Sequence, residues 1–183
     1  DPHEMLKQSE REAILHLLSE RQTDGVTGTA PIDPDWLIQD GNLQDYMLYY
    51  FPRSFYQWEP VNDYFFDFLE NNNRGLIMVP GQHGKTTMLL RWFIYVMCRE
   101  PQISLSYTEK NQPTADKRGN AILQELVKNK RLTDHYGQFK PAEKFQWSMA
   151  SFTIDQRPFI GDSPTFMAWG AGGGSILGWR ANI

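Results

Sequence analysis

Residues 80–87 read Pro-Gly-Gln-His-Gly-Lys-Thr-Thr, and their types and spacing suit them to bind phosphate. In a loop of this kind the backbone N–H groups surround an anion, and glycines at 81 and 84 let the backbone curl closely around it. A lysine at 85 reaches the β- and γ-phosphates of a nucleotide, and the Thr86 hydroxyl holds Mg²⁺. We therefore predict a nucleotide site with Thr86 as metal ligand and Lys85 as a catalytic residue, made by Gly81, Gln82, His83, Gly84, Lys85, Thr86 and Thr87.

The loop departs in one position from the G-x-x-x-x-G-K-[ST] pattern, because Val79 stands where the first glycine is expected. Its alternative interpretation is an ordinary turn between a strand and a helix. His83 also has two interpretations, a donor to phosphate or a plain loop residue. The flanking sequence favours the phosphate site, since a short apolar run precedes the loop and an apolar stretch of helical length follows it.

The elements that must position this loop alternate along the chain. Residues 76–79 predict a buried parallel strand and residues 86–99 a helix. A second strand is predicted at 103–107 and a second helix at 115–128. This alternation is typical of an α/β fold, in which helices flank a parallel sheet. Farther along, residues 145–154 predict a hairpin or paired strands, and 165–169 another strand.

The first 50 residues predict a small helical N-terminal extension. Ser9 and Glu12 have the spacing of a capping box, and the apolar residues that follow predict an amphipathic helix over about 10–21. A stretch dense in Gly, Thr and Pro marks a linker over about 22–33. A helix within 36–51 must end before Pro52, and helical spacing of large apolar residues predicts another over 61–70.

Composition narrows the class of protein. Among 183 residues, 40% are hydrophobic and 22% charged, which is typical of a folded globular chain and not of a disordered one. Cys98 is the single cysteine, which excludes an internal disulfide framework and favours a reducing, intracellular compartment. The net charge of -4 argues against a self-sufficient nucleic-acid binder. No apolar run is long enough for a membrane span, so no membrane partner is expected.

Five segments from about residue 51 onward resemble, in their order, the ATPase domain of the large terminase subunit, the DNA-packaging motor of tailed bacteriophages. They are the loop at 80–86, Thr108 with 111–126, the segment 132–137, the segment 163–170, and the glycine-rich segment 172–182. The resemblance implies a P-loop NTPase fold of the ASCE type over 51–183. The chain departs from the family at Gly81 and Gln82, where many members have an arginine.

The resemblance also implies an activity and partners. ATP hydrolysis with Mg²⁺ would drive double-stranded DNA into a preformed capsid, in the cytoplasm of the infected bacterial host and transiently at the portal vertex of the procapsid. The implied partners are DNA, copies of the chain in a ring, the portal protein and the small terminase subunit. In the family the Walker B acid, the catalytic glutamate and the nuclease domain follow the glycine-rich segment, so we expect a domain incomplete at its C-terminal end.

Two further residues are candidates for the nucleotide. Gln57 lies upstream of the loop where related motors keep an adenine-reading glutamine, and a side-chain amide both donates and accepts. Its alternative interpretation is an ordinary surface residue. Arg180, within the glycine-rich segment, is a candidate catalytic residue that contacts phosphate, with a structural salt bridge as the alternative.

Other functions stay open at the level of sequence. Basic residues around 110–118 and 128–131 either contact DNA phosphates or form solvated surface. A helicase-like or other DNA-translocating P-loop ATPase would share the loop, as would a small-molecule kinase. A truncated module that binds nucleotide without turnover is the non-enzymatic alternative.

Overall fold

The computed structural model describes residues 43–54, 60–72, 74–78, 80–142, 147–157 and 163–171. The chain divides into two compact units, Asp1–Gln57 and Trp58–Ile183. The predicted helix at 10–21 and the linker at 22–33 lie outside the described residues. The boundary predicted between residues 50 and 51 stays a prediction.

In the first unit the structure describes helix α3, Leu43–Tyr50. Its aromatic side chains pack against one another, with ring centroids 4.5 Å apart for Tyr46 and Tyr50 and 4.9 Å apart for Tyr49 and Tyr50. Phe51 N–H still donates to Met47 C=O at 2.9 Å, and the helix goes no further because proline follows at 52. The helix expected within 36–51 is thus confirmed over its described part.

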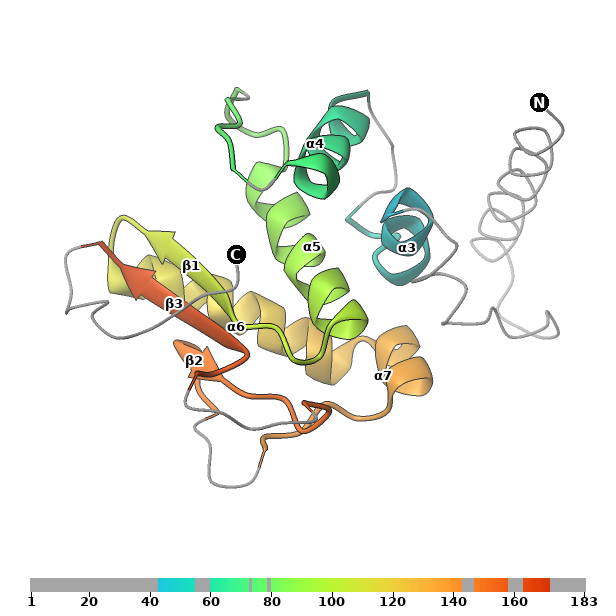
Figure 1. Cartoon of the computed structure of the whole chain (residues 1–183), viewed down its shortest axis with the longest axis vertical. Coiled ribbons are helices and arrows are strands. Elements are labelled where there is room, and N and C mark those ends of the chain that lie inside the picture. Colours follow the sequence, from blue (N-terminus) through green and yellow to red (C-terminus); the bar gives the residue numbers. More distant parts are fainter. Residues whose placement is uncertain are drawn as a thin grey trace, which may run out of the picture. The chain divides into compact units, whose positions relative to one another are not determined.

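The second unit begins with two helices, α4 at Pro60–Asn71 and α5 at Lys85–Arg99 (Figure 1). Both agree with the helices predicted at 61–70 and 86–99. Residues 92–97 of α5 are buried on all sides of the helix, and the Asn62 amide of α4 donates to the Met88 sulfur at 2.9 Å. The sequence was sufficient here because an apolar stretch of this length favours a buried helix.

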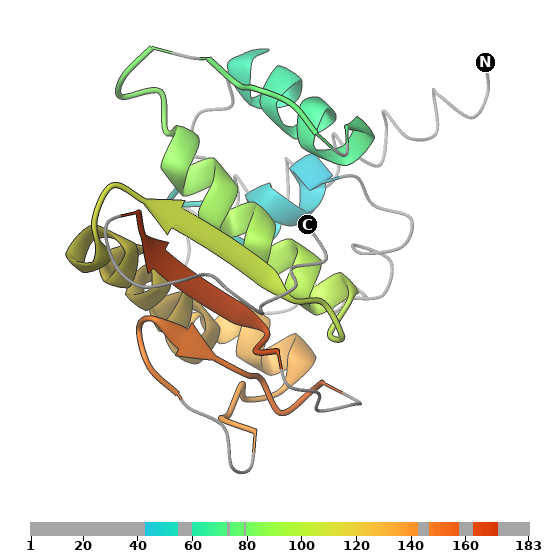
Figure 2. The same ribbon diagram turned by 60° about the vertical axis from the view of Figure 1, so that its left-hand side comes forward.

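In the part of the chain that the structure describes, the sheet has three strands in the order β1-β3-β2: β1 is Leu105–Glu109, β2 is Ser151–Phe152 and β3 is Phe166–Gly170. β1 and β3 are parallel, and β2 pairs antiparallel with β3. The crossover between the parallel strands includes helix α6, Gln112–Lys128, and a short helix α7, Lys130–Tyr136 (Figure 2). The strands predicted at 103–107 and 165–169 and the helix at 115–128 are therefore confirmed, with ends shifted by no more than three residues.

The core of this unit lies between one face of the sheet and the helices α5 and α6. Phe166 stacks on Phe152 at 5.2 Å between centroids, and Phe93 of α5 contacts both Phe166 and Tyr107, at 5.9 and 6.2 Å. Leu105 and Phe166, which are partners in the register, are fully buried on this face. Large rings from four elements thus form one packed cluster.

Two predictions about the sheet need correction. Residues 76–78 form no strand, and Leu76 and Met78 are 79% and 82% exposed, so the predicted buried strand is wrong for them; Val79 lies outside the described residues. A strand requires a partner, and the sheet is built by β1, β3 and β2 without this segment. The sheet is also mixed and not purely parallel, because β2 runs antiparallel to β3. The α/β class itself holds.

The paired strands expected at 145–154 are present in part. Trp147 and Phe152 form an antiparallel bridge across a tight turn, in which Ser148 N–H donates to Ser151 C=O at 2.9 Å. Helix α7 was not predicted; it begins where the Asn129 side chain accepts from Leu132 N–H. None of the helices in the described ranges combines the length and apolar character needed to span a bilayer.

Candidate functional site

The predicted phosphate loop occupies the turn that leads into α5, and two of its residues have left-handed backbones. Gly84, the residue before the helix, has φ 71° and ψ 7°, and Gln82 has φ 70°. Glycine takes this conformation without strain, whereas a side chain such as that of Gln82 costs about 1 kcal/mol there. Left-handed residues turn successive N–H groups toward one side, which is how backbone concavities bind anions.

Lys85 is the first residue of α5, and its side chain folds back over the loop. Its Nζ donates to the Pro80 carbonyl oxygen at 2.7 Å, across five residues of chain. The cap residue Gly84 supplies no side-chain acceptor to the first turn of the helix. The positive end of the helix dipole, its first-turn N–H groups and the Lys85 ammonium are therefore gathered at one place, which favours an anion.

The remaining residues of the predicted loop site surround this point. Gly81, Gln82, His83 and Thr87 are exposed, and Thr86 is half-buried in the first turn of α5. A hydroxyl of this kind is a suitable oxygen ligand for Mg²⁺, which usually shares its coordination with phosphates and water. Within the described ranges no three His, Cys, Asp or Glu side chains gather into a metal site. The structure thus brings all seven predicted loop residues together.

The loop lies at the end of the sheet where ligands bind in α/β folds. In both views the first turn of α5 and the carboxyl ends of β1 and β3 lie at the same end of the second unit (Figures 1 and 2). Contact between Phe93 and Tyr107 ties α5 directly to β1. Open parallel sheets bind ligands outside the carboxyl ends of their strands. The phosphate loop therefore lies at the same end of the second unit as the carboxyl ends of β1 and β3.

The carboxyl end of β1 carries a group that sequence reasoning missed. Glu109 accepts a hydrogen bond from the Tyr107 hydroxyl at 2.8 Å and lies 3.4 Å from the Arg118 guanidinium. The Tyr107 bond, aided by Lys110 N–H and Arg118, lowers the pKa of Glu109 against the effect of burial. Burial and the same hydrogen bond raise the pKa of Tyr107 to about 12. Glu109 is thus an ionised carboxylate at the carboxyl end of β1.

The sequence contained a signal for Glu109, since an acidic residue at the end of a short strand lies at the carboxyl end of the sheet. It was overlooked because the strand was expected to end at residue 107, two residues early. A second missed residue is Gln112, whose amide donates to Ala168 C=O at 3.2 Å and accepts from Gly170 N–H at 2.9 Å. The Gln112 side chain thus bonds to backbone groups of β3 beyond the residues that pair with β2. These bonds fix the start of α6 to the carboxyl end of β3.

Two predicted site residues, Gln57 and Arg180, lie outside the described residues, so their roles stay predictions. The comparisons with known proteins add no relative. No protein-family model, curated protein or solved structure matches the chain.

Proposed function

We propose that the chain is a P-loop ATPase whose residues 80–87 bind the phosphates of ATP together with Mg²⁺. The observation that carries this proposal is the Lys85 ammonium folded over a loop with two left-handed residues, at the start of a buried helix. An ordinary turn into a helix needs neither a lysine bonded back to the loop nor a glycine in this conformation at the cap. Both are what an anion-binding turn requires.

The proposed chemistry follows from the groups at the loop. Lys85 exchanges the Pro80 carbonyl for the β- and γ-phosphates, and the first-turn N–H groups of α5 hold the β-phosphate. The Thr86 hydroxyl would hold Mg²⁺, and the ion would supply positive charge beside the phosphates. Arg180 is proposed to contact phosphate, and Gln57 to contact the adenine edge.

The resemblance extends the proposal to a biological role. We propose the ATPase part of a large terminase subunit, which moves double-stranded DNA into a procapsid in the cytoplasm of a bacterial host. Its proposed partners are the DNA, further copies of the chain, the portal protein and the small terminase subunit. The order of the five resembling segments supports this role, beyond what a phosphate loop alone would suggest.

Mg²⁺-dependent ATP turnover and ATP binding test the proposal in parallel. Replacing Lys85 by Ala removes a charge that interacts most strongly with the transition state, so turnover should fall by at least about a hundredfold. The matched control is Lys140→Ala, which removes an exposed lysine on the loop after α7 and should leave turnover unchanged. Turnover that is indifferent to Lys85→Ala would contradict the P-loop assignment. ATP binding that depends on Lys85 without any turnover would support the phosphate loop and the alternative of a module that binds nucleotide, and would contradict only hydrolysis by this chain alone.

A further inference from the structure

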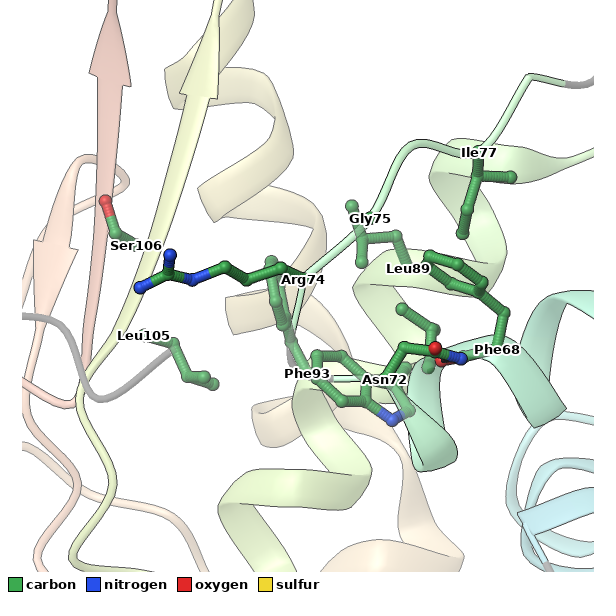
Figure 3. A pocket seen from close by; sticks show the side chains of 11 residues that line it. Phe68, Asn72, Arg74, Gly75, Ile77, Leu89, Phe93, Leu105 and Ser106 are labelled. Atoms are coloured by element: carbon green, nitrogen blue, oxygen red, sulfur yellow. Dashed lines mark hydrogen bonds between the residues drawn. The ribbon is translucent and has the colours of Figure 1, made fainter.

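A cavity of about 330 Å³ lies beside the helix that carries the phosphate loop (Figure 3). Its walls are the end of α4, residues 74–77, the second and third turns of α5, and the first residues of β1. Ligand pockets in proteins range from about 300 to 1,000 Å³, so this volume suits a single ring system with little else. The cavity was not foreseen from sequence, because it depends on the segment 74–78 lying apart from the sheet.

The lining has the chemistry of a site for a planar ring. Phe68, Trp92 and Phe93 supply aromatic surface, and the aliphatic side chains of Ile77 and Leu89 complete it. Aromatic side chains favour stacked or edge contacts with a flat partner. A flexible aliphatic ligand would gain no comparable benefit from three rings. The lining therefore favours an aromatic heterocycle.

Two polar side chains at the cavity have donors or acceptors that could bind such a ring. Arg74 is exposed and makes no hydrogen bond or ion pair with any described residue, and it extends toward β1 (Figure 3). Asn72 donates its amide to Phe68 C=O at 3.0 Å, which leaves its amide oxygen as an acceptor. A fork of donors and a separate acceptor match the ring nitrogens and exocyclic groups of a purine, and arginine is well suited to pair with purine acceptors.

The cavity and the phosphate loop are built by one continuous stretch of chain. Lys85, Leu89 and Phe93 follow one another at four-residue spacing, so they lie along one face of α5. Leu89 and Phe93 stand roughly 6 and 12 Å along the helix from Lys85. A ribose and one or two phosphates can bridge a separation of this order. The same molecule can therefore reach the loop and the cavity.

We propose that this cavity binds the purine base of the nucleotide whose phosphates bind at residues 80–86. The inference rests on the proposed function, since it assumes phosphate at the loop. It assigns contacts with the base to Arg74, Asn72 and the aromatic wall. A purine is preferred over a pyrimidine because the larger ring covers more of the aromatic lining.

Calorimetric titration with ATP, CTP and inorganic tripolyphosphate, each with Mg²⁺, separates the base from the phosphates. The natural chain should bind ATP about tenfold more tightly than tripolyphosphate, with CTP between them. Arg74→Ala should weaken ATP binding about three- to tenfold and leave tripolyphosphate binding unchanged. The control Lys128→Ala removes an exposed lysine at the far end of α6 and should change neither.

A second variant fills the cavity. Leu89→Phe occupies the space of the base, so ATP should bind no more tightly than tripolyphosphate, and thermal unfolding without ligand shows whether the variant is folded. Equal affinity of ATP and tripolyphosphate in the natural chain overturns the inference. So does ATP binding that depends on Lys85 but ignores both Arg74→Ala and Leu89→Phe, and in that case the proposed function stands. Tripolyphosphate binding that is absent, or indifferent to Lys85→Ala, would overturn the proposed function and with it this inference.

Discussion

The backbone of α6 lies directly against β3 and the turn before β2, whereas most of the segment 74–78 before α5 is exposed to solvent. A Cβ added at Gly119 of α6 would overlap the Met149 carbonyl oxygen, and Phe152 and Phe166 stack directly beneath. In the segment 74–78, by contrast, Leu76 and Met78 are largely exposed. A Cβ at Gly81, a few residues on, would meet nothing within 4 Å.

The difference separates what holds the fold from what carries the proposed chemistry. Parallel strands with their crossover helix form the rigid part, because the side chains between the strands and the helix are closely packed. The loop needs room for a ligand and N–H groups left open to it, so it cannot be packed in the same way. Binding groups commonly lie on loops held by a rigid scaffold for this reason.

The largest expected effect tests the packed region. Gly119→Ala should lower the free energy of unfolding by about 2–3 kcal/mol, because backbone and not a flexible side chain blocks the new methyl group. This sign opposes helix propensity, which by itself favours Ala over Gly by about 1 kcal/mol. Urea denaturation of the natural chain and the variant measures the change.

The matched control for that substitution is Gly81→Ala in the loop. Gly81 lacks a positive φ and its surroundings are open, so the unfolding free energy should change by less than about 0.5 kcal/mol. Equal losses in the two variants would show that the loop is as closely packed as α6, and the contrast drawn above would fail.

A smaller effect is expected from alkaline pH on the packed region. The pKa of Tyr107 is about 12 in the folded chain, above its ordinary value of 10.0, so the folded state favours the neutral form of the side chain. Its contribution to stability is complete below pH 10 and is lost as pH rises from 10 to 12, by on the order of 1 kcal/mol after allowance for solvent screening.

Comparing the pH dependence of unfolding in the natural chain and in Tyr107→Phe isolates this contribution. The variant should lose less stability between pH 10 and 12. Tyr64→Phe is the control, since Tyr64 is exposed and its replacement should leave the pH dependence unchanged. If Tyr107→Phe loses as much stability between pH 10 and 12 as the natural chain, the hydrogen bond from Tyr107 to Glu109 does not contribute to this pH dependence.

The smallest effect is expected in the exposed segment. Replacing Leu76 and Met78 together by Ser should change the unfolding free energy by less than about 0.5 kcal/mol, because little apolar surface is buried there. Ile103→Ser, at a buried position just before β1, is the contrasting control and should cost several times more. A loss above about 1.5 kcal/mol in the double variant would mean that the segment is a buried strand after all.

Much of the fold followed from local patterns. Helices α4 and α6 could be predicted because apolar spacing selects a helix without reference to distant residues, and α5 because its apolar stretch has the length of a helix. Asn111 marks the start of α6 by accepting from Thr114 N–H, a cap that is visible in sequence. The strand predicted at 76–79 is wrong for residues 76–78. An apolar stretch of four residues indicates that burial would be favourable, but it does not show that a partner strand is present.

The candidate site divides in the same way. Sequence by itself determined the loop residues 80–87 and their position before α5, because glycine conformation and lysine reach are properties of adjacent residues. Only the tertiary structure decided that Glu109 and Gln112 share the sheet edge and that Arg74 lies beside a cavity. These placements bring together residues from separate elements. They depend on strand register and helix packing, which cannot be predicted from a local sequence pattern.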